Sequence, residues 1–410
     1  MSLIPNELIY ASPQKNIEME GNYQEFSPLS GTSFTANDAF RINVASSTHF
    51  LDFQRSYLKY DLCITSTSAS VCSNLGGVAP IQRISESLGG LQISDIPSYA
   101  TMVALQNSVA SSTKQNFLKA TESYGVPTAF GTQDGVSSTW GRKVIHSLRT
   151  PLAGVRQLIP IPYCSYTLDI TLDTLNSVIK NASGSAYTIK NVRFVAYLVK
   201  PSGEYLQQIQ SAFSQGGSVK LPIEQIRSFT SRLSNVAQQS LLYNVGVCDS
   251  IRSFVACQRL STSINSATTD AYNLFTLNAL EWYFLNVSGK RFPQNFNCVV
   301  NNVKTNANYS ISQEQAMLLC ASVDNDFSQL NFSQSTDTSS DVSNTQQMLF
   351  YPLASSRSWA SGVSSKDGVV ECQLSYSSTP AGTETVNCFI SMDAIVEITN
   401  SSVHIRYTNL

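Results

Sequence analysis

The 410-residue sequence contains few charged residues, which make up only 13% of it. An average soluble domain is about 25% charged. Lys and Arg total 26 and Asp and Glu total 28, so the formal net charge is -2 and no bulk positive field attracts nucleic acid. A subunit that covers much of its exterior with neighbours needs few surface charges, so this composition favours an assembly subunit. A secreted Ser/Thr-rich β-protein would explain the same composition.

The N-terminal segment also lacks basic residues. The first 30 residues contain Glu7, Glu18, Glu20 and Glu25 against the single base Lys15. An arm that binds a genome has the opposite charge. We therefore expect no direct, sequence-specific nucleic acid binding by this arm.

Motifs for catalysis and metal binding are absent. The only histidines are His49, His146 and His404; none is in a metal-binding spacing, and we interpret each as a surface or strand residue. No phosphate-binding loop, dinucleotide fingerprint or G-x-S-x-G elbow occurs. Asp169 and Asp173 could form a carboxylate pair, but acids alternating along a solvated strand face explain them better. We predict no catalytic, cofactor-binding or metal site, and no enzyme.

The cysteines do not form a disulfide or zinc framework, since they are odd in number, widely spaced and without a C-x-x-C pair. We expect small core residues in a reducing compartment. They are Cys63, Cys72, Cys164, Cys248, Cys257, Cys298, Cys320, Cys372 and Cys388. A signal-peptide pattern is missing, and the longest apolar runs, 194–199 and 316–321, fall far short of the ~18 residues of a spanning helix. We expect a soluble chain that folds in the cytosol.

The clearest pattern that is present lies at residues 279–293, A-L-E-W-Y-F-L-N-V-S-G-K-R-F-P. Aromatic and β-branched residues predict a strand, S-G supplies a turn, and the final proline cannot donate to a strand ladder. Trp282 and Phe284 fall on one face while Leu285 and Val287 fall on the other. Large apolar groups on both faces predict a central strand of a β-sandwich.

The length predicts two domains of about 200 residues each. We expect an N-terminal arm at 1–30, a first β-domain at 31–201, a helical linker and transition at 202–244, and a second β-domain at 245–410. The best helix in the linker is 202–214, which has one apolar stripe and ends before Gly216-Gly217.

The two halves share one plan of strands, a short helix, a long loop and a closing pair of strands, which indicates architectural duplication. In the first half we expect strands at 40–44, 57–64, 157–175 and 187–199, a turn at 88–91, a helix that starts near Pro97 and a long surface excursion at 107–140. In the second half we expect strands at 253–259, 274–287, 369–376 and 386–406, the last split near Asn400. A helix starting at Ser312, an excursion at 322–344, a loop at 355–367 and a turn at 379–382 complete it.

Five pieces of the chain carry a family resemblance. They are F-Q-R-S-Y-L-K-Y-D-L at Phe53, I-S-E-S-L-G-G-L-Q-I-S-D at Ile84, P-I-P at Pro160, Y-T-I-K-N-V-R-F at Tyr187 and E-W-Y-F-L-N-V-S-G-K-R-F-P at Glu281. In this order they resemble the double jelly-roll major capsid proteins of double-stranded DNA viruses, the lineage of adenovirus hexons, tailless membrane-containing phages, virophages and polinton-like viruses. The resemblance covers nearly the whole chain.

The resemblance implies an all-β fold with a few short helices: two tandem eight-stranded jelly-roll β-sandwiches. It further implies a homotrimer that forms a pseudo-hexagonal capsomer and tiles an icosahedral shell in the virion. Neighbouring capsomers, penton and minor capsid proteins would be partners, and an internal membrane would lie near the N-terminal arm. The excursions at 107–140 and 322–344 would be towers or intersubunit clamps, and assembly would take place in the host cytoplasm or nucleus.

Two other functions stay open. A minor capsid or vertex protein would share the fold. A carbohydrate-binding adhesin would present aromatic platforms in loops, where we expect Trp140 and Trp359. Lys290-Arg291 could pair with an acid of a neighbouring subunit, although a solvated turn pair is the simpler interpretation. Five N-x-[ST] sites give a weak modification hypothesis: Asn181, Asn286, Asn308, Asn331 and Asn400.

Overall fold

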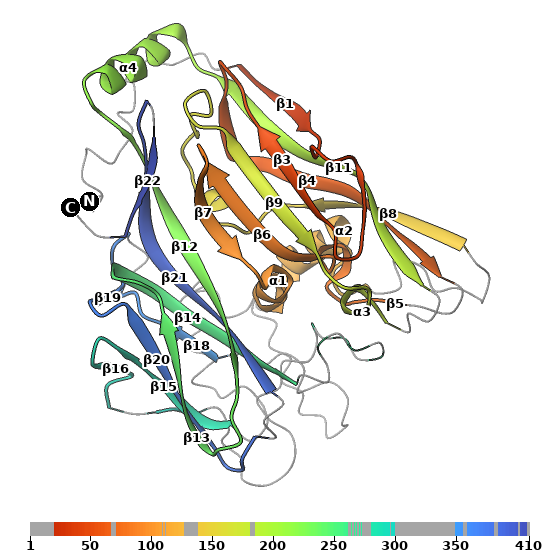
Figure 1. The fold of residues 1–410 in the computed structure, drawn as a ribbon, viewed down its shortest axis with the longest axis vertical. Helices are drawn as coiled ribbons and strands as arrows, with labels where there is room; N and C mark the ends of the chain where they lie inside the picture. The colour runs from red at the N-terminus through yellow and green to blue at the C-terminus, as the bar shows by residue number, and fades with distance from the viewer. Residues whose placement is uncertain are drawn as a thin grey trace.

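The computed structural model describes residues 20–66, 71–108, 110, 112–126, 138–180, 185–260, 264, 266, 268, 270, 272, 280–295, 297–299, 349–355, 359–380, 384–400 and 402–407. These residues form two β-sandwiches that lie side by side (Figure 1). The expected helix at Ser312 and the excursion at 322–344 lie outside the described residues.

The first sandwich packs two sheets of antiparallel strands. One has the order β1 (Glu20–Phe26), β11 (Ala186–Lys200), β4 (Phe50–Ser66), β8 (Ser138–His146), with β2 (Ser33–Thr35) added to β11. The other has the order β3 (Ala39–Val44), β9 (Tyr166–Leu172), β6 (Ile81–Leu88), β7 (Leu91–Ile96). Strands β5 (Val71–Cys72) and β10 (Ile179–Lys180) pair as a separate two-stranded ribbon. The short helices described in this half are η2 (Gly76–Val78), α1 (Tyr99–Ser108), α2 (Ser112–Thr121), η4 (Leu152–Gly154) and α3 (Leu175–Val178).

The second sandwich repeats this arrangement. One sheet has the order β12 (Val219–Arg232), β21 (Glu384–Ile398), β14 (Cys248–Leu260), β18 (Leu349–Pro352), with β19 (Val363–Ser365) and β22 (Val403–Arg406) at its margins. The other has the order β13 (Gln238–Asn244), β20 (Val369–Tyr376), β15 (Leu280–Val287), β16 (Lys290–Phe292), with β17 (Cys298–Val299) on β15. Helix α4 (Gly203–Ser214) connects the two sandwiches.

The strand orders identify both sandwiches as jelly rolls. Within each half, we number the eight main strands of the described residues along the chain and set the short marginal strands aside. The hydrogen-bonded orders are then 1-8-3-6 and 2-7-4-5 in both halves. Two four-stranded sheets connected in this way form a jelly roll. The predicted fold, two tandem eight-stranded jelly rolls, is therefore confirmed.

Several predicted elements lie where the patterns placed them. Strand β20 has the predicted bounds, and β9 buries every second residue. Ser202 caps α4 by accepting a hydrogen bond from the Tyr205 N–H, and the helix buries Tyr205, Ile209 and Phe213. The residues Gly89 and Gly90, both with positive φ, form the two-residue turn between β6 and β7, as tight hairpins require.

At two places the strand pairing extends a jelly roll beyond its expected domain boundary. Strand β1 lies inside the expected arm but pairs with β11, and its side chains are almost all exposed, so it has no apolar pattern. Strands β12 and β13 lie inside the expected transition but are the first two strands of the second jelly roll. Strand β12 contains Pro222, which it tolerates because its other edge makes no ladder among the described residues.

The expected excursion at 107–140 is also partly regular. Helix α2 lies within this excursion, and the last residues of the excursion, 138–140, form the start of β8. Trp140 therefore lies in a strand and not in a loop. The loop expected at 355–367 likewise contains the short strand β19.

We predict that the buried face of β15 contributes strongly to the free energy of unfolding of the second jelly roll. Leu285 is 0% exposed there, whereas Leu242 on the outer face of β13 is 68% exposed. Leu285→Ala should lower the free energy of unfolding by about 2–5 kcal/mol because it leaves a cavity. The matched control Leu242→Ala should change it by less than about 0.5 kcal/mol. Urea unfolding followed by tryptophan fluorescence measures both values, and equal losses would contradict this packing.

Candidate functional site

A continuous apolar core joins the two jelly rolls. Buried residues of β12 and β21, among them Leu221, Ile223 and Val396, belong to the same cluster as the buried residues of the first jelly roll. Figure 1 shows β7 beside β12 and β22 at this place, which we call the joint. Each such side chain stabilises the contact by about 1.5–3 kcal/mol when fully buried. The joint therefore binds the two jelly rolls into one body.

Polar contacts tie the segment between β14 and β15 to the first jelly roll. The carboxylate of Asp270 accepts hydrogen bonds from the Ser73 hydroxyl at 2.8 Å and the Asn74 N–H at 2.7 Å. The ammonium group of Lys180 donates to the Ser266 carbonyl at 3.1 Å. Hydrogen bonds to charged groups contribute about 1.5–3 kcal/mol each, so the contacts of Asp270 and Ser266 help to hold the two jelly rolls together.

A buried amide connects three elements across the joint. The side chain of Asn387, on β21, is 1% exposed. Its carbonyl oxygen accepts from Nε and Nη2 of Arg259 at 3.1 and 2.7 Å. Its amide nitrogen donates to the hydroxyls of Ser98 at 3.2 Å and Thr230 at 3.0 Å. Ser98 directly precedes α1, so this network reaches from the second jelly roll to the first.

The predicted strand histidine His146 lies on β8 but is completely buried. Its Nε2 is 2.7 Å from the hydroxyl of Tyr99, and its Nδ1 is 2.7 Å from a carboxylate oxygen of Glu122. Burial raises the pKa of Glu122, but the neighbouring His146 and Arg149 more than offset this and hold the pKa below its usual value. This cluster fastens α1 and the end of α2 to β8. Sequence patterns could not indicate it, because the residues are far apart along the chain.

Glu86 on β6 is a second buried carboxyl group. It accepts hydrogen bonds from Thr150 at 2.7 Å, Tyr166 at 2.9 Å and Ser94 at 3.3 Å. Burial raises the pKa of Glu86 to about 7, and these donors offset only part of that rise. The folded chain therefore favours the neutral form of this carboxyl group far more than an unfolded chain does.

The two aspartates considered as a carboxylate pair have different surroundings. Asp169 forms a two-bond ion pair with Arg41 on the outer face of the first jelly roll, with distances of 2.6 and 2.9 Å. Asp173 is buried and accepts from the Tyr272 hydroxyl at 2.9 Å. The prediction of a solvated face holds for Asp169 and is wrong for Asp173, because Tyr272 packs against that carboxylate.

The outer face of β3, β9, β6 and β7 carries a balanced row of charges. Arg41 pairs with Asp169, and Arg83 pairs with Asp95 at 2.7 and 2.6 Å. The charge of Asp169 also raises the pKa of Arg83, after the larger effects of Asp95. Exposed ion pairs stabilise a fold little. They nevertheless keep this face polar and electrically neutral.

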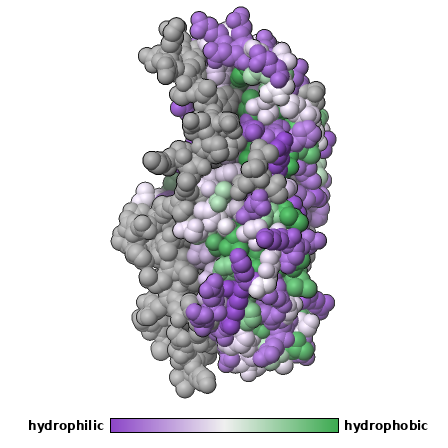
Figure 2. Space-filling view, turned by 90° about the vertical axis from the view of Figure 1, so that its left-hand side faces the viewer, coloured by the Kyte–Doolittle hydropathy of each residue, from purple (hydrophilic) through white to green (hydrophobic). Residues whose placement is uncertain are grey.

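The corresponding face of the second jelly roll carries aromatic side chains. The rings of Trp282 and Phe284 stack with centroids 6.0 Å apart, and the Arg291 guanidinium lies 4.2 Å from the Phe284 centroid. Lys290 is exposed as predicted, but Arg291 is half-buried and not simply solvated. The face of the molecule in Figure 2 mixes hydrophilic side chains with smaller apolar patches.

The remaining candidates are isolated. Nδ1 of His49 lies 2.9 Å from the hydroxyl of its neighbour Thr48, and Nε2 of His404 lies 2.9 Å from the hydroxyl of Ser402. Trp359 lies in a turn with its indole nitrogen buried. Of the sequon residues, Asn286 is half-buried on β15 and contacts Glu371 at 3.2 Å, whereas Asn400 is exposed. Asn181, Asn308 and Asn331 lie outside the described residues.

The described cysteines are free thiols, seven of them buried; Cys320 is not among them. Burial raises the pKa of several, for example to about 12 for Cys164 and Cys257. Within the described ranges, no group of three or more His, Cys, Asp or Glu side chains is placed to hold a metal ion. A search of the same ranges found no helix long and apolar enough to cross a membrane.

Comparisons with known proteins concern the fold as a whole. No family model matches the sequence, and no curated protein matches it. Solved structures do match. PBCV-1 VP54, as fitted into a reconstruction of the virophage Sputnik, is 10% identical with a TM-score of 0.63, over 98% of this chain and 99% of that chain.

Two further structures match over similar lengths. The Faustovirus major capsid protein is 10% identical with a TM-score of 0.63, over 96% of this chain and 92% of its own. A chain of the Sputnik virophage structure is 14% identical with a TM-score of 0.59, over 95% and 88%. Together with the strand orders, these similarities define the fold class: this chain has the double jelly-roll fold. It shares that fold with the Faustovirus major capsid protein.

We predict that Glu86 makes stability depend on pH. The pKa of a glutamate in an unfolded chain is about 4.3, so between that pH and 7 the folded state binds more protons than the unfolded state. Stability should therefore fall by about 4 kcal/mol as pH rises through this window, and level off above it. Glu86→Gln should remove most of this slope.

The control for this prediction is Glu204→Gln, at an exposed position of α4. Chemical unfolding of the three proteins at several pH values between 4.5 and 8 measures the slopes. A slope in Glu86→Gln equal to that of the unchanged protein and of the control would contradict the role of Glu86.

Proposed function

We propose that this chain is a structural major capsid protein without catalytic activity. Three copies form a pseudo-hexagonal capsomer, and the capsomers tile an icosahedral virus shell. The observation that carries the proposal is the likeness to the Faustovirus major capsid protein over nearly the full length of both chains. A shared module would produce a match over part of the length only.

The duplicated architecture supports the trimer. Each chain supplies two jelly rolls with one strand order. Three chains around a threefold axis would therefore present six similar units, which approximates a hexagon and packs densely on a surface. Such packing needs a constant angle between the two jelly rolls of a chain, and the apolar joint together with the polar contacts of Asp270 and Asn387 supports it.

The surfaces of the chain are compatible with contacts between subunits. One outer sheet face has a neutral row of paired charges, and the other has the stacked rings of Trp282 and Phe284. The aromatic residues are of the kind enriched in protein interfaces. The low content of charged residues, 13% of the sequence, points the same way.

The finer expectations belong to this proposal. The chain acts in the virion, next to penton and minor capsid proteins, and is assembled in the host cytoplasm or nucleus. Its N-terminal arm lies under the shell, near an internal membrane where the virus has one. A minor capsid or vertex protein with the same fold would differ in copy number per particle.

The carbohydrate-binding alternative has less support. It relied on Trp140 and Trp359 as platforms in loops. Trp140 lies in strand β8, and Trp359 has a buried indole nitrogen. Binding to a glycan array by a monomeric protein would revive this alternative.

The proposal predicts a stable trimer. Light scattering on the purified chain in reducing buffer should give a mass of three times 44.8 kDa. Electron microscopy of the same peak should show a pseudo-hexagonal outline. A monomer that neither trimerises on its own nor enters shells when co-expressed with its virus's other capsid proteins would contradict the proposal.

A further inference from the structure

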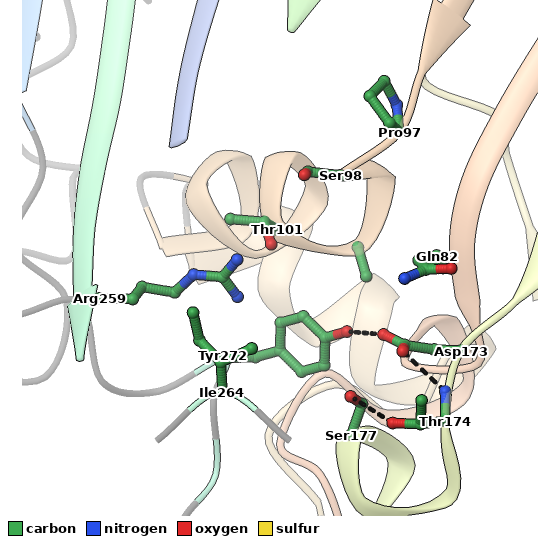
Figure 3. Close-up of a pocket in the computed structure, with 11 residues that line it drawn as sticks. Gln82, Pro97, Ser98, Thr101, Asp173, Thr174, Ser177, Arg259, Ile264 and Tyr272 are labelled. Carbon is green, nitrogen blue, oxygen red and sulfur yellow. Dashed lines mark hydrogen bonds between the residues drawn. The ribbon is translucent and has the colours of Figure 1, made fainter. Parts of the chain in front are cut away.

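A cavity of about 210 Å³ lies in the joint between the jelly rolls (Figure 3). Its walls come from both jelly rolls: the first turn of α1, the residues after β9, the end of β14, and Ile264 and Tyr272. A water molecule occupies about 30 Å³ of liquid, so the cavity has room for a small polyatomic ligand and several waters. The lining is largely polar, with Gln82, Ser98, Thr101, Asp173, Arg259 and Tyr272 among its residues.

Arg259 places a buried positive charge at this cavity. Its side chain extends from β14 toward the first turn of α1 (Figure 3) and the residue is only 8% exposed. Nε and Nη2 donate to the neutral carbonyl oxygen of Asn387. Among the described residues, no carboxylate lies within ion-pair distance of it. A buried guanidinium without an anionic partner is costly, so the site favours an anion.

The acid in the same cavity does not supply this partner. The oxygens of Asp173 accept from the Tyr272 hydroxyl at 2.9 Å and the Thr174 N–H at 2.7 Å. Figure 3 shows the Tyr272 ring between Asp173 and the guanidinium of Arg259. The cavity therefore has a positive end at Arg259 and a separate acidic end at Asp173.

Further donors surround the positive end. Ser98 accepts from the Asn387 amide at 3.2 Å, so its own hydroxyl hydrogen remains available to a ligand. The Thr101 hydroxyl lines the same wall. The first N–H groups of a helix have no partner inside the helix, and the helix dipole adds positive potential there. Both hydroxyls therefore line the α1 side of the cavity, near Arg259.

We propose that this cavity binds a small tetrahedral oxyanion, such as phosphate or sulfate, between Arg259 and the first turn of α1. The anion accepts hydrogen bonds from the guanidinium of the second jelly roll and from the hydroxyls of the first. Its binding is linked to folding, because the site exists only when the joint is formed. The inference does not depend on the capsid role.

The test is phosphate binding at constant ionic strength. Isothermal titration of the purified chain with sodium phosphate should show one site per chain, and phosphate or sulfate should raise the unfolding temperature above that in chloride. Arg259→Gln should abolish both effects. The control Arg41→Gln removes an exposed arginine of the first jelly roll and should retain them.

Milder variants keep the test decisive if Arg259→Gln does not fold. Ser98→Ala should weaken phosphate binding about tenfold or more, because it removes one hydrogen bond to a charged group. Arg259→Lys should also weaken it, since the ammonium lacks the planar fork. Unchanged affinity in these variants, or no phosphate binding by the unchanged chain, would overturn the proposal. An equal effect of acetate would contradict the tetrahedral specificity.

Discussion

The apolar joint between the two jelly rolls is the contact on which the rest of the structure depends. Leu221 and Ile223 of β12 and Val396 of β21 are buried in the same cluster as the core of the first jelly roll. The hydrogen bonds of Asp270 and Asn387 reinforce it at two places. Because apolar burial is non-directional, these polar contacts supply the orientation. A building block for a shell needs this combination of strength and fixed geometry.

The two jelly rolls preserve their connectivity while their sequences differ. The fourth and fifth main strands form a hairpin in each half, closed by Gly89-Gly90 in the first and Ser288-Gly289 in the second. All four turn residues have positive φ, as the favoured two-residue hairpin turns require. Turn chemistry and alternation are thus retained where residue identity is not. The fold as a whole likewise matches solved structures at only 10–14% identity.

Much of this architecture could be predicted from the sequence, and the failures have physical causes. Strands with one buried face, such as β9 and β20, show clear alternation. Strand β1 has no buried face, so its sequence shows no apolar alternation. Strand β12 contains Pro222, and the alternation of buried and exposed residues is lost in its second half. Contacts between distant residues, such as His146 with Glu122 or Asp173 with Tyr272, leave no local pattern. The joint leaves no local pattern either, because strands far apart along the chain, β7 and β12, meet there.

The joint also offers the most direct test of this account. If it makes one body of two jelly rolls, the chain should unfold in a single transition in differential scanning calorimetry, with equal calorimetric and van't Hoff enthalpies. The same transition should be seen by fluorescence and by circular dichroism. Two separate transitions, one for each jelly roll, would show that the contact between them is weak and would contradict the account.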